Sequence, residues 1–389
     1  MKKIAGILVA MLVVAVWSTA YAGEPPTAGS VRCDEFSGAW MQTVYQTDYA
    51  SRTTEQNKRY LRDQLDRLRR AGITAVLFQV RPSADAFYDS KLEPWSRFLS
   101  KDGRAPKPYW DPLEFMVEEA HARGMELHAW INPYRVSTSK KQRLPKGHIY
   151  HRHPERFVRY ADGLIYFDPG IPENRKWIVE VVSDIASRYD IDGVHFDDYF
   201  YPYPVAGKDF PDAASYKKYG KKKNKAAWRR ENVDKLIADI HGTLRKIGEK
   251  KHHYIEFGVS PFGIWRNKAS DPRGSETSGL QNYDDLYADP LLWAEKGWVD
   301  YLIPQIYWEN THKRAPYTEL ILWWATNVDP RCKLYIGQDV ERTMKSRELR
   351  LKTQLATDLD AVKGNCWWPA GTITANTLGV ADSLRVIYR

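Results

Sequence analysis

Short apolar segments alternate with amphipathic segments along the chain from about residue 35 onward, and this alternation restricts the fold most. Eight of the apolar segments have the length and composition of buried strands. These eight segments are Ala39–Val44, Ala75–Arg81, Glu126–Asn132, Gly193–Asp198, Ile255–Ser260, Tyr301–Tyr307, Lys333–Gly337 and Asn365–Pro369. Because strands that alternate with helices form a parallel sheet, and eight such units close it, the sequence predicts an α/β fold of the (β/α)8, or TIM-barrel, class.

The segments between the predicted strands have helical spacing. Leu61, Leu65 and Leu68 would lie on one face of a helix over Arg59–Ala71. Asp111–Pro112 has the N-cap aspartate and first-turn proline that begin a helix. Further helices are expected at Pro172–Arg188, Trp228–Ile247, Pro290–Lys296, Thr318–Asn327, Ser346–Val362 and Leu378–Val386.

No linker or change in composition divides residues 35–389, so we expect a single barrel domain there. Two connections are long, namely Tyr134–Gly170 after the third strand and Tyr199–Ala227 after the fourth. Long loops that follow barrel strands form the walls of the binding face. The basic run Lys217–Lys225 falls in the second loop and is expected to be a solvated surface.

The first 22 residues have the pattern of a secretory signal peptide. Lys2 and Lys3 precede the apolar run Ile4–Trp17, and Ala20–Ala22 forms a small-x-small cleavage site. The alternative is an uncleaved anchor, but the apolar run is short for a membrane-spanning helix. We therefore predict signal peptide 1–22, a flexible tail 23–34, a periplasmic or secreted location and no membrane anchor after cleavage. Cys33 follows Ser-Val-Arg, which is not a lipoprotein cleavage site.

The charge and the cysteine content say little about the function of the chain. The formal net charge of +9 is spread along the chain, so we expect it to serve solubility and expect no nucleic-acid partner. No glycine-rich phosphate loop is present, and no cofactor is expected. Cys33, Cys332 and Cys366 allow one disulfide in an oxidising compartment, with three possible pairings.

The segment Asp192–Pro202 passes from a buried strand to a polar end. Val194 and Phe196 are apolar, whereas the alternate positions carry the polar residues His195, Asp197 and Tyr199. Alternate residues of a strand face opposite sides. The pattern therefore predicts that Asp197 points into the barrel end with His195 and Tyr199, and that Asp198 is a rim or support residue.

Polar residues occupy the same inward parity on several other strands. The inward set is Gln79, Arg81, His128, Asn132, His195, Asp197, Gln305 and Tyr307. Burying a polar group costs a few kcal/mol unless it is hydrogen-bonded. Several strands that bury polar groups at one end therefore indicate a polar site there.

The residue types of this set suit a polyhydroxylated substrate, because amides and arginine bond hydroxyl groups and aromatic faces stack on sugars. Glycoside hydrolysis needs one carboxylic acid and a second group that activates water or stabilises the cation. Asp197 is the expected essential carboxylate, and Asp85, Asp339 and Glu341 are other candidate acids.

Two alternatives to a glycoside hydrolase remain at this point. One is a metal hydrolase with His128, His195 and Asp197 as ligands, although Ala39–Thr43 lacks the His-x-His that amidohydrolase barrels carry after strand one. The other is a glycan-binding barrel that has lost its catalyst.

Seven motifs, taken in order, resemble the glycosyl-hydrolase-like family 10. They are Phe78–Pro82 with Asp85–Tyr88, Ala120–His121 with His128–Arg135, Asp192–Pro202, Trp228–Asn232, Ser260–Arg266, Pro304–Trp308 and Ile336–Gln338. The resemblance implies a (β/α)8 barrel outside the cytoplasm that hydrolyses bacterial cell-wall glycan, including strands without stem peptides. It also implies a site at Asp197 and its neighbours.

With this resemblance, the candidate catalytic residues are Asp197 and Asp198. The candidate substrate-binding residues are Gln79, Arg81, Asp85, Tyr88, His128, Asn132, Tyr134, Arg135, His195, Tyr199, Gln305, Tyr307 and Trp308.

Asp192–Tyr199 is also similar to the Asp-Gly-x-Asp-x-Asp-x-Glu motif of family-18 chitinases. His195 replaces the first inner aspartate, and Tyr199 replaces the glutamate that serves as the acid. Either Asp197 is itself the acid or nucleophile, or another strand supplies the acid.

Overall fold

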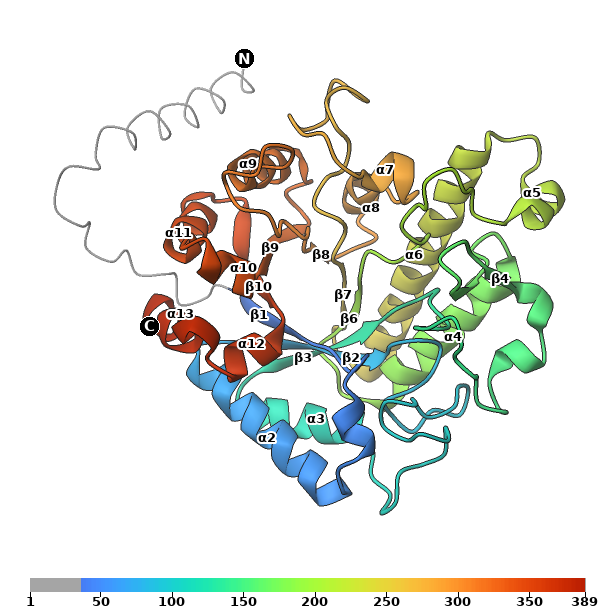
Figure 1. The fold of residues 1–389 in the computed structure, drawn as a ribbon, viewed down its shortest axis with the longest axis horizontal. Coiled ribbons are helices and arrows are strands. Elements are labelled where there is room, and N and C mark those ends of the chain that lie inside the picture. The colour runs from blue at the N-terminus through green and yellow to red at the C-terminus, as the bar shows by residue number, and fades with distance from the viewer. Residues whose placement is uncertain (1–35, 389) are drawn as a thin grey trace. The chain divides into compact units, whose positions relative to one another are not determined.

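The structure is a computed structural model that describes residues 36–388. The predicted signal peptide, the predicted tail and Cys33 lie outside the described residues. Eight parallel strands form a closed barrel in the order β1-β10-β9-β8-β7-β6-β3-β2 (Figure 1). Their bounds are β1 (Phe36–Met41), β2 (Ala75–Arg81), β3 (Glu126–Ile131), β6 (Gly193–Phe196), β7 (Glu256–Val259), β8 (Tyr301–Leu302), β9 (Lys333–Asp339) and β10 (Val362–Trp368). The predicted fold class is confirmed, and each predicted strand overlaps one of these eight.

Helices surround the barrel strands in Figure 1. They are α2 (Thr54–Arg70), α3 (Pro112–His121), α4 (Pro172–Arg188), α5 (Ala213–Tyr219), α6 (Lys225–Lys251), α7 (Asn282–Asp285), α8 (Pro290–Glu295), α9 (Tyr317–Asn327), α10 (Val340–Lys345), α11 (Leu349–Asp358), α12 (Ala370–Thr374) and α13 (Val380–Ile387). Short 3-10 turns lie at Thr47–Ala50, Ile149–His151, Pro154–Arg156 and Thr377–Gly379. No helix within residues 36–388 has both the length and the apolar composition needed to span a membrane.

One predicted helix differs from the structure. The sequence pattern placed a single helix over Ser346–Val362, whereas α11 covers only Leu349–Asp358. Arg347 has a left-handed backbone with φ +61°, which no helix interior contains. This residue separates α10 from α11, and the chain after Asp358 turns into β10.

Two layers of side chains hold the barrel together. The outward residues of the strands, such as Val76 and Phe78 of β2, are fully buried in the main core with the helices. A smaller cluster fills the barrel interior and includes Trp40, Trp130 and Tyr301. The interior is therefore a packed core.

The loop after β3 contains a hairpin that the sequence pattern did not predict. Within it β4 (Phe157–Arg159) pairs antiparallel with β5 (Ile165–Phe167). The loop after β6 contains α5, as expected for a long connection.

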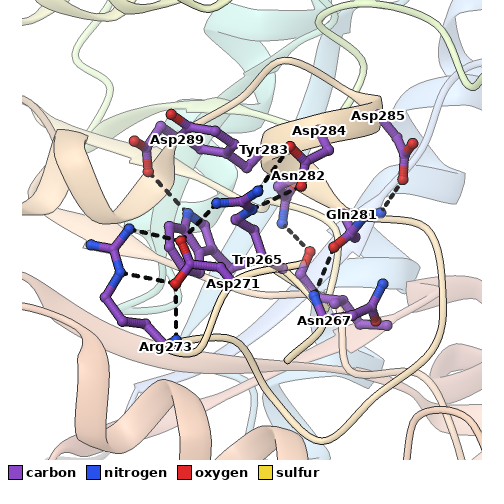
Figure 2. Close-up of polar contacts among 12 residues, drawn as sticks. Trp265, Asn267, Asp271, Arg273, Gln281, Asn282, Tyr283, Asp284, Asp285 and Asp289 are labelled. Carbon is purple, nitrogen blue, oxygen red and sulfur yellow. Dashed lines mark hydrogen bonds and ion pairs between the residues drawn. The ribbon is translucent and has the colours of Figure 1, made fainter. Parts of the chain in front are cut away.

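A third long loop, residues 260–289, follows β7 and was not predicted to be long. Figure 2 shows the polar contacts that fold it upon itself. Arg266 binds Asp271 at 2.7 Å and Asp284 at 2.8 Å, and the Trp265 indole donates to Asp289 at 3.0 Å. These contacts give the loop a defined shape.

The two cysteines within the described residues, Cys332 and Cys366, are buried and free. A disulfide between these two is therefore absent from the structure.

Candidate functional site

A pocket of about 340 Å³ lies at the carboxyl ends of the barrel strands. It is lined by Trp40, Gln42, Val44, Tyr45, Gln79, Trp130, Arg135, Asp197, Asp198, Tyr199, Tyr203, Ser260, Phe262, Gln305, Tyr307, Trp308 and Trp368. The lining is mostly aromatic with a few polar groups, as is usual for a small-molecule or sugar site. The third long loop contributes Phe262 to it.

Asp197 and Asp198 are the only carboxylates in this lining, and both are almost fully buried, with 5% and 2% of their surface exposed. The sequence pattern predicts Asp198 to be a rim or support residue, and the structure buries it in the pocket lining beside Asp197. Strand β6 ends at Phe196, so the alternation of faces ends there and two successive side chains reach the same pocket.

The other candidate acids do not line the pocket. Asp85 accepts a hydrogen bond from the Ser83 backbone N–H at 3.1 Å, and Asp339 caps α10 through the Arg342 N–H. Glu341 forms an exposed ion pair with Lys345. The carboxyl that shares the pocket lining with Asp197 is therefore that of its neighbour, Asp198.

Each carboxyl is held by its own set of donors. The Asn132 amide and the Trp130 indole, at 3.4 Å, donate to Asp197 Oδ2, and the Tyr199 backbone N–H donates to Oδ1 at 3.2 Å. The Tyr203 hydroxyl donates to Asp198 Oδ2. These contacts fix both carboxyl groups without a cation bonded to either.

Burial raises the pKa of Asp197 to about 7, and the negative charge of Asp198 adds to this shift while Arg135 opposes it. Burial also raises the pKa of Asp198, against hydrogen bonds from Tyr203 and Gln305. Two adjacent carboxyls in a poorly solvated site resist double ionisation and retain one proton between them. A pair that shares one proton can supply one acid and one base, which is what glycosidic bond cleavage requires.

The two histidines proposed as metal ligands lie in the barrel interior, below the pocket, and both are fully buried. An indole N–H can only donate, so the Trp40 contact of 3.1 Å makes His195 Nε2 an acceptor. Neutral His195 then carries its proton on Nδ1 and donates to the Tyr301 hydroxyl at 3.2 Å. Burial holds the pKa of His195 well below its usual value, which keeps the ring neutral.

The same chain of hydrogen bonds continues to the far end of the barrel. The Tyr301 hydroxyl donates to His128 Nδ1 at 2.8 Å, and His128 Nε2–H donates to Glu126 at 3.1 Å. All four ring nitrogens are therefore engaged by protein groups. Among residues 36–388, no three acidic, histidine or cysteine side chains converge as metal ligands would, and His128, His195 and Asp197 do not form such a group.

This chain of donors predicts one tautomer for His195. We expect ¹⁵N NMR of uniformly labelled protein to show a neutral His195 ring with its proton on Nδ1 throughout pH 5–8, because burial disfavours the charged form. The His195→Gln variant identifies which signal belongs to this ring. A ring that titrates in this range, or a proton on Nε2, would contradict the assignment of donors.

The pocket brings together eight of the candidate residues named from the sequence. They are Asp197, Asp198, Gln79, Arg135, Tyr199, Gln305, Tyr307 and Trp308.

The other seven lie outside its lining. They are Arg81, Asp85, Tyr88, His128, Asn132, Tyr134 and His195. Protein groups already engage the inward polar side chains among them. Arg81, for example, binds Glu93 at 2.6 Å, and Asn132 lies between Gln79 and Asp197.

Several aromatic residues of the pocket were not named from the sequence. They are Trp40, Tyr45, Trp130, Tyr203, Phe262 and Trp368. Trp40 and Trp130 have the inward parity of their strands, and this signal could have found them. Tyr45, Tyr203 and Phe262 lie in loops, where no periodic pattern reports the direction of a side chain.

Comparison with known proteins identifies the family of this chain. Residues 35–351 match the model of the family described as glycosyl hydrolase-like 10. Glycosyl hydrolase YngK of Bacillus subtilis (strain 168) is 39% identical over 402 residues, which cover 99% of this chain and 78% of the relative. Glycosyl hydrolase DigH of Escherichia coli (strain K12) is 41% identical over 340 residues, which cover 81% of this chain and 75% of the relative.

Solved structures show the same fold at low sequence identity. The PgaB (BpsB) glycoside hydrolase domain from Bordetella bronchiseptica superposes with a TM-score of 0.59 at 15% identity, over 91% of this chain and 98% of that one. The catalytic domain of β-amylase from Paenibacillus polymyxa gives a TM-score of 0.55 at 11% identity, over 88% and 94%. The family model covers most of the chain, both relatives are glycosyl hydrolases, and the fold is that of a glycoside hydrolase domain. The chain therefore belongs to the glycosyl hydrolase-like 10 family.

Proposed function

We propose that this protein hydrolyses glycosidic bonds in bacterial cell-wall glycan, including strands that have lost their stem peptides, in the periplasm or outside the cell. The observation that carries the proposal is the pair of buried carboxyls in one aromatic pocket. Family membership and the names of the two relatives support a glycoside hydrolase. The signal-like sequence of residues 1–22 supports an export route.

The electrostatics of the pair suggest a division of roles. Asp197, whose pKa is raised to about 7, holds a proton near neutral pH and donates it to the oxygen of the leaving sugar. Asp198 is the ionised partner, which activates water or stabilises the positive charge that develops on the sugar ring. When water completes the cleavage, its proton restores the acid form of the pair.

The remaining lining suits the substrate that this chemistry needs. Trp308 and Trp368 contribute aromatic rings to the pocket lining, and Gln42 and Gln305 contribute amides. Aromatic faces stack on the apolar faces of sugars, and amides bond hydroxyl and acetamido groups. Arg135 is the one basic side chain in the pocket lining.

The proposal predicts which polymer is cut. The full chain is incubated with peptide-free glycan strands, intact peptidoglycan, chitin and β-glucan, and new reducing ends and product masses are measured. We expect release from peptidoglycan glycan, fastest from the peptide-free strands, because stem peptides would obstruct the approach of the strand to the pocket. Cleavage confined to β-glucan would overturn the substrate class. Binding to glycan without release from any polymer would favour the glycan-binding barrel instead.

A further inference from the structure

Tyr45 stands at the edge of the pocket in an unusual backbone conformation. It has φ +64°, lines the pocket and leaves 60% of its surface exposed. It is the third residue of a tight turn that Gln46 N–H closes onto the Thr43 carbonyl at 3.2 Å. The third position of a turn with positive φ usually takes glycine or asparagine, so a tyrosine there is strained.

Packing does not account for this tyrosine. Its ring makes an edge contact with Phe98, with ring centres 6.0 Å apart, and most of its surface still faces solvent. A glycine would fit the turn without strain. A strained and exposed aromatic residue beside an active-site pocket is a candidate for ligand contact.

Two buried amides connect this turn to the reacting carboxyl. Gln79 Oε1 accepts the backbone N–H groups of Thr43 at 3.0 Å and Val44 at 2.8 Å. Gln79 Nε2 donates to Asn132 Oδ1 at 2.6 Å, and the Asn132 amide nitrogen donates to Asp197. Each amide is held at both ends, so the two residues before Tyr45 have a fixed position relative to Asp197.

A pair of tyrosines lines the same pocket as Tyr45. Tyr199 and Tyr203 stack with their ring centres 5.2 Å apart, and Tyr203 is 38% exposed. The Tyr45 phenol is close enough to contribute to the raised pKa of Tyr199, although burial is the largest cause. The pocket lining therefore brings Tyr45 and this tyrosine pair together with the two carboxyls.

We propose that Tyr45 is a sugar-stacking residue of the glycan cleft, which holds a pyranose ring next to the one whose bond is cleaved. Gln79 and Asn132 are positioning residues that set the distance between this stacking face and Asp197. The inference rests on the proposed function, since it names a subsite of the same cleft. It accounts for a tyrosine at a backbone position that favours glycine.

Three substitutions distinguish the effect of the Tyr45 ring from the effect of its backbone conformation. Tyr45→Phe keeps the aromatic face, whereas Tyr45→Ala and Tyr45→Gly remove it. Kinetics on peptide-free glycan strands should show KM raised roughly five- to tenfold in the Ala and Gly variants alike, with kcat little changed, and a near-normal KM in the Phe variant. A residue with only a structural role would not give this split between KM and kcat.

Thermal unfolding of the same variants reports the strain. We expect Tyr45→Gly to melt at a higher temperature than Tyr45→Ala, because both lose the ring and only glycine relaxes at positive φ. Lys222, with φ +65° on an exposed turn away from the pocket, is the matched control. Lys222→Gly should likewise melt above Lys222→Ala, with KM unchanged in both.

The outcomes distinguish this inference from the proposed function. If the wild-type protein cleaves glycan strands and the Ala and Gly variants at Tyr45 keep a normal KM, the stacking role is wrong and the hydrolase assignment stands. If the wild-type protein binds strands without cleaving them, titration calorimetry replaces KM, and a loss of affinity confined to the Ala and Gly variants supports the stacking role alone. If the wild-type protein neither cleaves nor binds these strands, both are overturned.

Discussion

Asp197→Asn is expected to lower kcat on glycan strands by roughly 10²–10⁴-fold while leaving the protein folded. The variant keeps the shape of the side chain, and the amide oxygen can still accept from Asn132. It cannot give a proton to a leaving oxygen. Asp198→Asn should cause a loss of similar size because it removes the charge that the reaction needs beside the acid.

The pH dependence of stability tests the same pair independently of substrate. A carboxyl whose folded-state pKa is raised contributes stability that is present below its ordinary pKa of about 4 and is lost as pH rises through the folded value. For Asp197 that folded value is about 7. Asp197→Asn should therefore be more stable than wild type at pH 8, by roughly 1–3 kcal/mol in urea unfolding, and this advantage should vanish near pH 4.

The control for both measurements is Asp339→Asn. Asp339 caps α10 outside the pocket lining, and asparagine is an equally good cap, so rate and stability should stay close to wild type. A near-normal rate for folded Asp197→Asn would show that another group is the acid. If the wild-type rate does not fall as pH rises above about 7, the reaction does not need the protonated form of Asp197.

The barrel was predictable because its strands carry two independent signals, apolar outward faces and regular alternation with helices. Predictions failed where strand geometry ends. Tyr301–Tyr307 reads as a seven-residue strand, but β8 stops at Leu302, ahead of Pro304, which has no N–H for a strand ladder. The same limit misplaced Asp198, because parity has no meaning after Phe196.

The site was predictable as a region and less so as a residue set. Inward parity correctly selected Gln79, Asp197 and Tyr307, which line the pocket. The same parity selected His128 and Arg81, which protein groups engage below or behind it. Parity reports which way a side chain points and not how far along the barrel axis it lies, so substrate contacts and buried supports look alike in sequence.

Arg81 is one of these supports, and its loss should give the largest effect on stability. Its guanidinium binds Glu93 in a bidentate pair at 2.6 and 2.7 Å and donates to the backbone carbonyls of Asn132 and Pro133. Both charged side chains are essentially unexposed, at 0% and 1%. Arg81→Met would leave the Glu93 charge buried and unpaired, which should cost roughly 3–5 kcal/mol in urea unfolding.

A double-mutant cycle isolates the pair. Glu93→Gln should also destabilise the protein, and the combined Arg81→Met and Glu93→Gln variant should lose clearly less than the sum of the two single losses, because neither charge is then left alone. Arg385→Met removes a partner from the exposed Arg385–Asp382 pair, measured at 3.0 Å, and should cost less than about 1 kcal/mol. Additive losses at Arg81 and Glu93 would mean that they act separately. Coupled losses would show that Arg81 and Glu93 act as a pair. A reduced kcat in folded Arg81→Met would show in addition that the pair supports the end of β3, because Asn132 follows this strand and donates to Asp197.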